Sequence, residues 1–308
     1  MQAAATNYLN SGVNISTPNG VVGRFTPAYF DVTRVHGCPA GGFTYGGVAA
    51  PAVAGQPFSV TATARNALGA PTLNYHSANG FAKDTTISNA GDATGFASNV
   101  IAGASGFANG VGTINTINYR FAAKETAPIT LTLRGVDTPD GVSSMGHTEE
   151  TTPARSGRLY IQNAFGSELL ALPMPLHAQY YLDSNAGFVT NTADSCTAIN
   201  TPLIDLINNV ENPIQGIAAI KVKLGPPDPT TTAGIANAPV SAGDAGLSFS
   251  APTPTGEGYV DVSFNLSGMP WLQYDWDGDG AHNNNPVGRA TFGIYKGSPR
   301  QIYLRERY

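Results

Sequence analysis

Three aspartates at every second position mark the segment YDWDGDGAHNNNP, residues 274–286. Calcium takes about six to eight oxygen ligands, and a tight loop supplies them when carboxylates at loop positions 1, 3 and 5 converge over a glycine at position 6. Asp275, Asp277, Asp279 and Gly280 fit this spacing. The segment therefore predicts a calcium loop in which the three aspartate side chains bind the ion.

The residues after Gly280 offer neutral oxygens to the same ion. The carbonyl of Ala281 falls at position 7 and Asn283 at position 9, and Asn285 adds another amide. Position 12 is Pro286 instead of the bidentate glutamate of a helix–loop–helix site, so the loop is not an EF-hand. An all-oxygen cage without histidine predicts a structural ion. The alternative is a bare acidic turn, because Asp and Gly also favour turns.

Residues suited to catalysis are few. The sequence has no HExxH metal motif, no GxSxG nucleophile elbow and no phosphate-binding P-loop. Glu149 and Glu150 are adjacent, so in an extended segment they point to opposite faces, which does not suit an acid/base pair. We expect them in a solvated linker, and the chain is predicted not to be an enzyme.

Two tryptophans, Trp271 and Trp276, flank the first aspartate of the acidic segment. Exposed aromatic rings can stack on sugars, so both are candidates for contacts with a glycan. Large aromatic side chains in β-proteins also serve as core or edge packing, and that alternative stays open.

The overall composition limits the class of protein. The 308 residues carry a net charge of -5 without any Lys/Arg cluster, which argues against a nucleic-acid partner. No apolar run is long enough to span a bilayer. The start, MQAAATNYLN, lacks the basic and apolar regions of a signal peptide. Charged residues make up 12% of the chain, and 36 Gly and 22 Pro predict many turns between short strands.

Alternation of apolar and polar residues with a period of two recurs along the chain and predicts an all-β fold. The segments are 24–35, 58–66, 114–122, 129–137, 157–166, 168–183, 217–224, 258–266, 288–295 and 300–306. Strands at regular spacing on both sides of a polar stretch predict tandem immunoglobulin-like β-sandwich domains.

The polar, turn-rich stretch 137–157 is the best candidate for a linker between these domains. It divides the chain into an N-terminal extension at 1–18, a first sandwich at 19–150 and a second sandwich with the acidic segment at 151–308. Small and turn-forming residues at 88–112 and 225–246 predict surface loops. The segment 201–212 is a short helix candidate that reads equally well as a loop.

Only two cysteines occur, Cys38 and Cys196, and their spacing fits neither a zinc site nor a haem attachment motif. Their number alone leaves both a disulfide and two free thiols open.

Several strings together resemble the large C-terminal region of the MshQ-like proteins, which are associated with biogenesis of the mannose-sensitive haemagglutinin (MSHA) type IV pilus. They are NGVVGRFTPAYFDV (19–32), CPAGGFTYGG (38–47), GRLYIQNAFGSELLALPMPLHAQYY (157–181), TNTADSCT (190–197) and the stretch from PWLQYDWDGDG to the final residue (270–308). The resemblance runs from about residue 19 to the end and is weak at 77–112 and 225–246.

This resemblance implies an exported protein of the pilus or bacterial cell surface and no known reaction. An oxidising compartment favours a Cys38–Cys196 disulfide. Family members tend to carry further aspartates after DWDGDG, whereas this chain has AHNNNP, which would weaken the metal site. We therefore expect a non-enzymatic, extracellular structural or adhesive component whose partners are pilins, other surface proteins or surface glycans. The alternative is a carbohydrate-binding module of a secreted enzyme.

Overall fold

The computed structural model describes residues 26–206, 220–223 and 229–293. Within these ranges the regular structure consists of β-strands and three short 3-10 turns, with no α-helix. The all-β prediction is therefore confirmed. None of the described segments forms a helix with the length and apolar character needed for a bilayer crossing. The extension expected at 1–18 and the strand expected at 300–306 lie outside the described residues.

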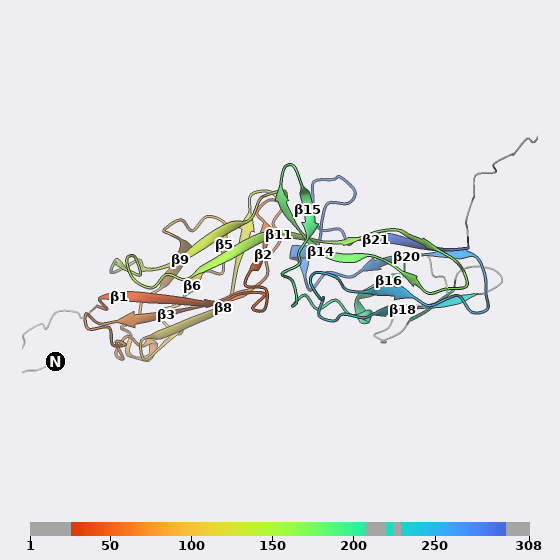
Figure 1. The fold of residues 1–308 in the computed structure, drawn as a ribbon. Coiled ribbons are helices and arrows are strands. Elements are labelled where there is room, and N and C mark those ends of the chain that lie inside the picture. Colours follow the sequence, from red (N-terminus) through yellow and green to blue (C-terminus); the bar gives the residue numbers. More distant parts are fainter. Residues whose placement is uncertain (1–25, 207–219, 224–228, 294–308) are drawn as a thin grey trace, which may run out of the picture.

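Figure 1 shows the strands gathered into two lobes that lie end to end. The first lobe, residues 26–156, holds β1 (Tyr29–Val35), β2 (Thr44–Val48), β3 (Phe58–Arg65), η2 (Ser77–Asn79), β4 (Thr85–Asn89), β5 (Phe96–Ala97), β6 (Val100–Ile101), β7 (Phe107–Ala108), β8 (Val111–Phe121), β9 (Ile129–Asp137), β10 (Val142–Ser143) and the start of β11 (Thr151–Ile161).

The second lobe, residues 157–293, continues from the end of β11. It holds β12 (Ala164–Gly166), β13 (Leu172–Pro173), β14 (Leu176–Asp183), β15 (Gly187–Thr190), η3 (Thr201–Leu203), β16 (Ile204–Leu206), β17 (Ile220–Lys223), β18 (Thr230–Ile235), β19 (Leu247–Phe249), β20 (Gly258–Phe264), η4 (Pro270–Leu272) and β21 (Val287–Phe292).

The strands form one large and two small sheets. The large sheet has the order β1-β3-β8-β2-β11-β9-β4-β6, with β5, β7, β10, β14 and β15 attached beside this path. The small sheets have the orders β12-β21-β20-β16 and β13-β19-β18-β17. Both small sheets belong to the second lobe, so the large sheet is the one that reaches across the molecule.

The long strand β11 connects the two lobes. Its first half pairs with β2 in parallel and with β9 in antiparallel orientation. Its second half, from Gly157 to Ile161, pairs with β14. Because one uninterrupted strand belongs to the hydrogen-bond ladders of both lobes, a large rotation of the lobes about this segment would break ladder hydrogen bonds.

Each lobe has its own hydrophobic core. In β3 the sequence FSVTATAR alternates strictly between buried and half-buried side chains, as the period of two predicts. Phe30, Val60 and Phe107 belong to the core of the first lobe. The core of the second lobe includes Phe249 and Phe292. It also includes Cys38, Phe43 and Tyr45 from the first part of the chain, so the second core extends to the boundary between the lobes.

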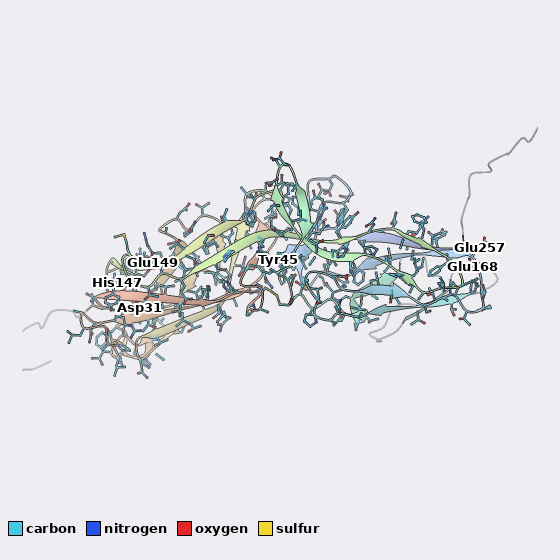
Figure 2. All side chains as sticks on the ribbon, in the orientation of Figure 1. Asp31, Tyr45, His147, Glu149, Glu168 and Glu257 are labelled. Atoms are coloured by element: carbon cyan, nitrogen blue, oxygen red, sulfur yellow. A yellow bond between two sulfur atoms is a disulfide. The ribbon has the colours of Figure 1, made fainter. Side chains whose placement is uncertain are left out.

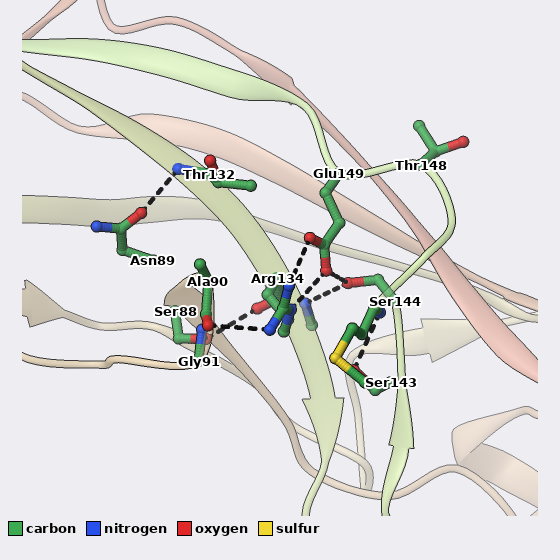
Figure 3. A network of polar contacts seen from close by, with 12 residues as sticks. Ser88, Asn89, Ala90, Gly91, Thr132, Arg134, Ser143, Ser144, Thr148 and Glu149 are labelled. Carbon is green, nitrogen blue, oxygen red and sulfur yellow. Dashed lines mark hydrogen bonds and ion pairs between the residues drawn. The ribbon is translucent and has the colours of Figure 1, made fainter.

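The stretch 137–157 differs from the expected solvated linker, because it contains β10 and half of β11. Figure 3 shows how Glu149 is held: Arg134 donates to both of its carboxylate oxygens, at 2.7 and 3.0 Å, and Ser144 donates at 2.8 Å. Glu150 forms an ion pair with Arg34 at 3.3 Å. Both glutamates therefore pair with arginines from other strands, although the Glu150 side chain is still partly exposed, and composition does not reveal such a pairing.

Three other expectations need correction. The segment 225–246 contains strand β18, where the β-branched run TTTAGI buries Thr231 and Ala233. The segment 201–212 begins with the 3-10 turn η3 and continues as strand β16, so its described part is not an α-helix. In the segment 88–112, short strands alternate with turns, and Ile101 and Phe107 are buried.

Candidate functional site

The acidic loop, residues 274–286, closes on itself at its base. Tyr274 and Asn284 exchange two backbone hydrogen bonds, at 3.2 and 3.1 Å. Gly278 and Gly280 adopt left-handed backbone conformations, with φ of 77° and 84°, which glycine accepts at low cost. These turns fold the chain back sharply enough for the three aspartates to approach one another.

Asp275, Asp277 and Asp279 each offer a carboxylate oxygen, and these oxygens lie within 4.8 Å of one another. Asp275 accepts hydrogen bonds from the backbone nitrogens of Gly278, at 2.8 Å, and Gly280, at 3.0 Å. Desolvation acts to raise the pKa of Asp275, but these backbone donors outweigh it and hold the pKa below its usual value. The Asp275 carboxylate therefore stays ionised at neutral pH, with the other two carboxylates close beside it.

The three residues predicted to supply neutral oxygens, Ala281, Asn283 and Asn285, differ from one another in their contacts. Ala281 donates its backbone nitrogen to Asp279 at 2.7 Å, so it lies beside the carboxylates. The side-chain oxygen of Asn285 accepts from Leu266 and Gln273 instead, at 3.1 and 3.2 Å. Asn283 is exposed, and Asn284 donates to Asp277 at 3.1 Å. An all-oxygen donor set suits a hard cation such as calcium, with the three aspartates as the residues that would hold it.

A cluster of aromatic rings lies behind the acidic loop. Tyr274 packs edge-on against Phe188, with ring centroids 5.3 Å apart, and against Trp276 at 4.9 Å. Tyr160 lies 6.1 Å from Trp276. The Arg158 guanidinium is central to this cluster, 4.0 Å from the Phe188 ring and 5.1 Å from the Trp276 ring. Cation–π contacts with several rings hold the aromatic side chains in fixed positions.

The two predicted stacking residues differ in exposure. Trp276 is 37% exposed and borders an open depression, which is also lined by Asp277, Asn283, Asn284 and Val287. Trp271 is half-buried and packs against the core of the second lobe. Of the two, Trp276 is therefore the one placed to meet a ligand.

The joint between the lobes carries a second cluster of polar groups. We use "the joint" for Cys38, Tyr45, Lys124, Asn191, Asp194 and Cys196 with their direct partners. Cys38 and Cys196 form a disulfide with their Cα atoms 5.6 Å apart. The predicted pairing is thus present, and it ties the start of the first lobe to the loop after β15.

Asp194 is completely buried beside this disulfide. One carboxylate oxygen accepts from the Tyr45 hydroxyl at 2.8 Å and from the Thr197 hydroxyl at 2.6 Å. The other accepts from the backbone nitrogens of Thr197 and Cys196, at 3.0 and 3.1 Å. Asn191 in turn donates to the Tyr45 hydroxyl at 2.7 Å and accepts from Arg155. Each of these buried groups has a partner, as a stable interior requires.

Tyr45 is fully buried at the point where the lobes meet (Figure 2). Burial, and then the neighbouring Asp194 carboxylate, raise the pKa of Tyr45 well above its ordinary value, so the hydroxyl stays a hydrogen-bond donor. Gly157 of β11 makes room for the ring, because a Cβ there would lie 2.4 Å from a Tyr45 ring carbon. The sequence provided no period or motif that singled out Asp194 or Tyr45.

Lys124 is also completely buried at the joint. Its ammonium nitrogen donates to the backbone oxygen of Trp271 at 2.7 Å, across the boundary between the lobes. The backbone oxygen of Lys124 accepts from the Ser156 hydroxyl. Burial lowers the pKa of Lys124 to about 7, although Glu125 acts in the opposite direction. The joint therefore contains one group that changes charge near neutral pH.

Comparison with family models identifies both parts of the chain. Residues 1–158 match the model described as DUF6701, third domain, and residues 155–307 match DUF6701, fourth domain. The chain belongs to the DUF6701 family. The two DUF6701 models meet within β11, the strand that both lobes share. Searches among curated proteins and among solved structures found no match.

Proposed function

We propose that this DUF6701 chain is a non-enzymatic extracellular component of an MSHA-like type IV pilus or a related bacterial surface system. In this role it is a structural spacer that also presents an adhesive surface. Its partners would be pilins or other surface proteins, and surface glycans.

The observation that carries this proposal is the joint. The end-to-end lobes share strand β11 and are linked by the Cys38–Cys196 disulfide. An element that holds two lobes in line suits a spacer that must keep its length, whereas an enzyme with a site between lobes would need them to move. The disulfide also favours export, because such bonds persist in oxidising compartments.

The proposal includes two finer features of the fold. We take each lobe to be an immunoglobulin-like β-sandwich, so the chain is two sandwiches in tandem, which is a common architecture for cell-surface proteins. The acidic loop would bind a structural calcium ion through Asp275, Asp277 and Asp279. Its all-oxygen donors support this assignment.

A second candidate is a carbohydrate-binding module of a secreted enzyme. The depression beside Trp276, with its amides and carboxylate, is the observation that favours it. The two candidates differ in genomic context, because pilin and assembly-ATPase genes nearby favour the surface role, and hydrolase or lyase genes favour the enzyme module.

The surface role is tested by locating the protein on cells of its own source. Antibodies against the 308-residue chain, visualised by immunogold electron microscopy on intact cells, should label pili or the cell surface. Disruption of the gene should remove the label and reduce piliation or attachment. Label confined to the cell interior, or normal piliation and attachment in the disrupted strain, would reject the role.

A further inference from the structure

The depression beside the acidic loop combines an aromatic side chain with several hydrogen-bonding groups. Trp276 and Val287 supply apolar surface, with exposures of 37% and 55%. Asp277, Asn283 and Asn284 supply a carboxylate and two amides along the same lining. Sugar-binding sites need this combination, because a pyranose ring has an apolar face of C–H groups and an edge of hydroxyl groups.

The aromatic side chain is already held in place. Its ring packs against Tyr274 at 4.9 Å, and the Arg158 guanidinium lies 5.1 Å from its centroid. Its backbone nitrogen donates to the Asn284 side chain at 3.1 Å. A side chain that is ordered before binding loses little conformational entropy when a ligand stacks on it.

The polar groups are also arranged for hydroxyl recognition. Asn284 bridges Trp276 and Asp277. Its side-chain oxygen accepts from the Trp276 backbone nitrogen, and its side-chain nitrogen donates to the Asp277 carboxylate, each at 3.1 Å. Within the described residues, the Asn283 side chain has no hydrogen-bond partner and is exposed. A carboxylate oxygen accepts from sugar hydroxyls, and an amide can both donate and accept, so adjacent hydroxyls can be bound together.

We infer that this depression binds the terminal neutral pyranose of a glycan, with Trp276 stacking on the sugar ring and Asp277 and Asn283 binding its hydroxyls. The neighbouring Asp275 and Asp279 add negative charge, which repels acidic sugars such as sialic acid. This inference deepens the adhesive part of the proposed function and rests on it.

The test uses the whole 308-residue protein with its disulfide intact, in buffer containing a chelator, so that Asp277 and the other carboxylates of the acidic loop carry no bound calcium. The probes are an immobilised set of neutral oligosaccharides built from glucose, galactose, mannose and N-acetylglucosamine, and a matched sialylated set. The wild type should retain neutral glycans and not sialylated ones. Titration calorimetry with the best neutral oligosaccharide then gives its affinity.

Trp276→Ala should weaken that affinity at least about tenfold, and Trp276→Phe should retain part of it. Phe165→Ala is the matched control, because Phe165 is a 72% exposed aromatic on β12 that does not line the depression. Equal melting temperatures of the variants exclude a folding defect. The inference is overturned by absence of neutral-glycan binding, by stronger sialylated binding, or by an unchanged affinity in Trp276→Ala. Such a failure leaves the surface role intact, because immunogold labelling measures that role separately.

Discussion

Asp194 at the joint and Asp277 in the acidic loop are both carboxylates with hydrogen-bond partners, yet their surroundings differ completely. Asp194 is fully buried and accepts from Tyr45, Thr197 and Cys196, which are brought together from both lobes. Asp277 is exposed, and its described partners all lie within the same loop. A buried carboxylate with distant partners stabilises the fold, whereas an exposed one with local partners keeps its capacity to bind something else.

The difference between Asp194 and Asp277 predicts that the joint contributes more to the free energy of unfolding than the acidic loop does. Replacing both Cys38 and Cys196 with serine removes a link across 158 residues of sequence. In the chain-entropy model, such a loop contributes about 4–5 kcal/mol to the free energy of unfolding. Urea denaturation should show this loss. A loss below about 1 kcal/mol would mean that the shared strand and the buried polar groups hold the lobes without the disulfide.

Asp194→Ala should be the next largest effect. It leaves the Tyr45 and Thr197 hydroxyls buried without their acceptor, at a cost of about 3 kcal/mol. The matched variant Asp277→Ala, measured without calcium, should change the free energy of unfolding by less than about 0.5 kcal/mol. If urea denaturation gave equal losses for Asp194→Ala and Asp277→Ala, the joint would be no more important for stability than the acidic loop.

The acidic loop is expected to contribute to stability only when calcium is bound. An ion bound by the acidic loop stabilises the folded state by about 2.7 kcal/mol when its concentration is a hundredfold above the dissociation constant. Addition of a chelator should therefore lower the melting temperature of the wild type. Asp277→Ala should show no difference between calcium and chelator. Identical wild-type melting under both conditions, with no heat of binding, would leave the loop as a bare acidic turn.

The smallest predicted effect concerns Lys124 and pH. Its pKa is about 7 in the folded state, below the usual value of 10.5, so above pH 7 the unfolded chain binds more protons than the folded one. Stability should therefore rise with pH, by roughly 1 to 2 kcal/mol between pH 7 and 8.5. In Lys124→Met this rise should be absent from urea denaturation curves. A variant that keeps the same slope would show that another group causes it.

The sequence predicted the elements with strong local patterns. The alternation in FSVTATAR identified β3, and the spacing of Asp275, Asp277 and Asp279 predicted their convergence. These features depend on residues close together in the chain, so backbone geometry alone determines them.

The joint was not predicted beyond its disulfide, because its polar contacts join distant residues. Tyr45 and Asp194 are 149 residues apart, and Lys124 and Trp271 are 147 apart. For the same reason Glu149 looked like part of a solvated linker, although it pairs with Arg134 in a neighbouring strand. Burial of a charged side chain depends on which strands become neighbours, and composition does not specify that.

The disulfide also determines how the molecule responds to a pulling force. Tension applied at Thr26 and Gly293 first loads the ladder between β1 and β3. Once β1 is detached, the load passes from Cys38 to Cys196 through the bond, so the intervening strands, including the whole of β11, carry almost none of it. The 158-residue separation corresponds to roughly 500 Å of extended chain at about 3.4 Å per residue, and the bond withholds that length. Under tension the part of the first lobe that follows Cys38 is therefore shielded from extension, and only β1 can be drawn out of it.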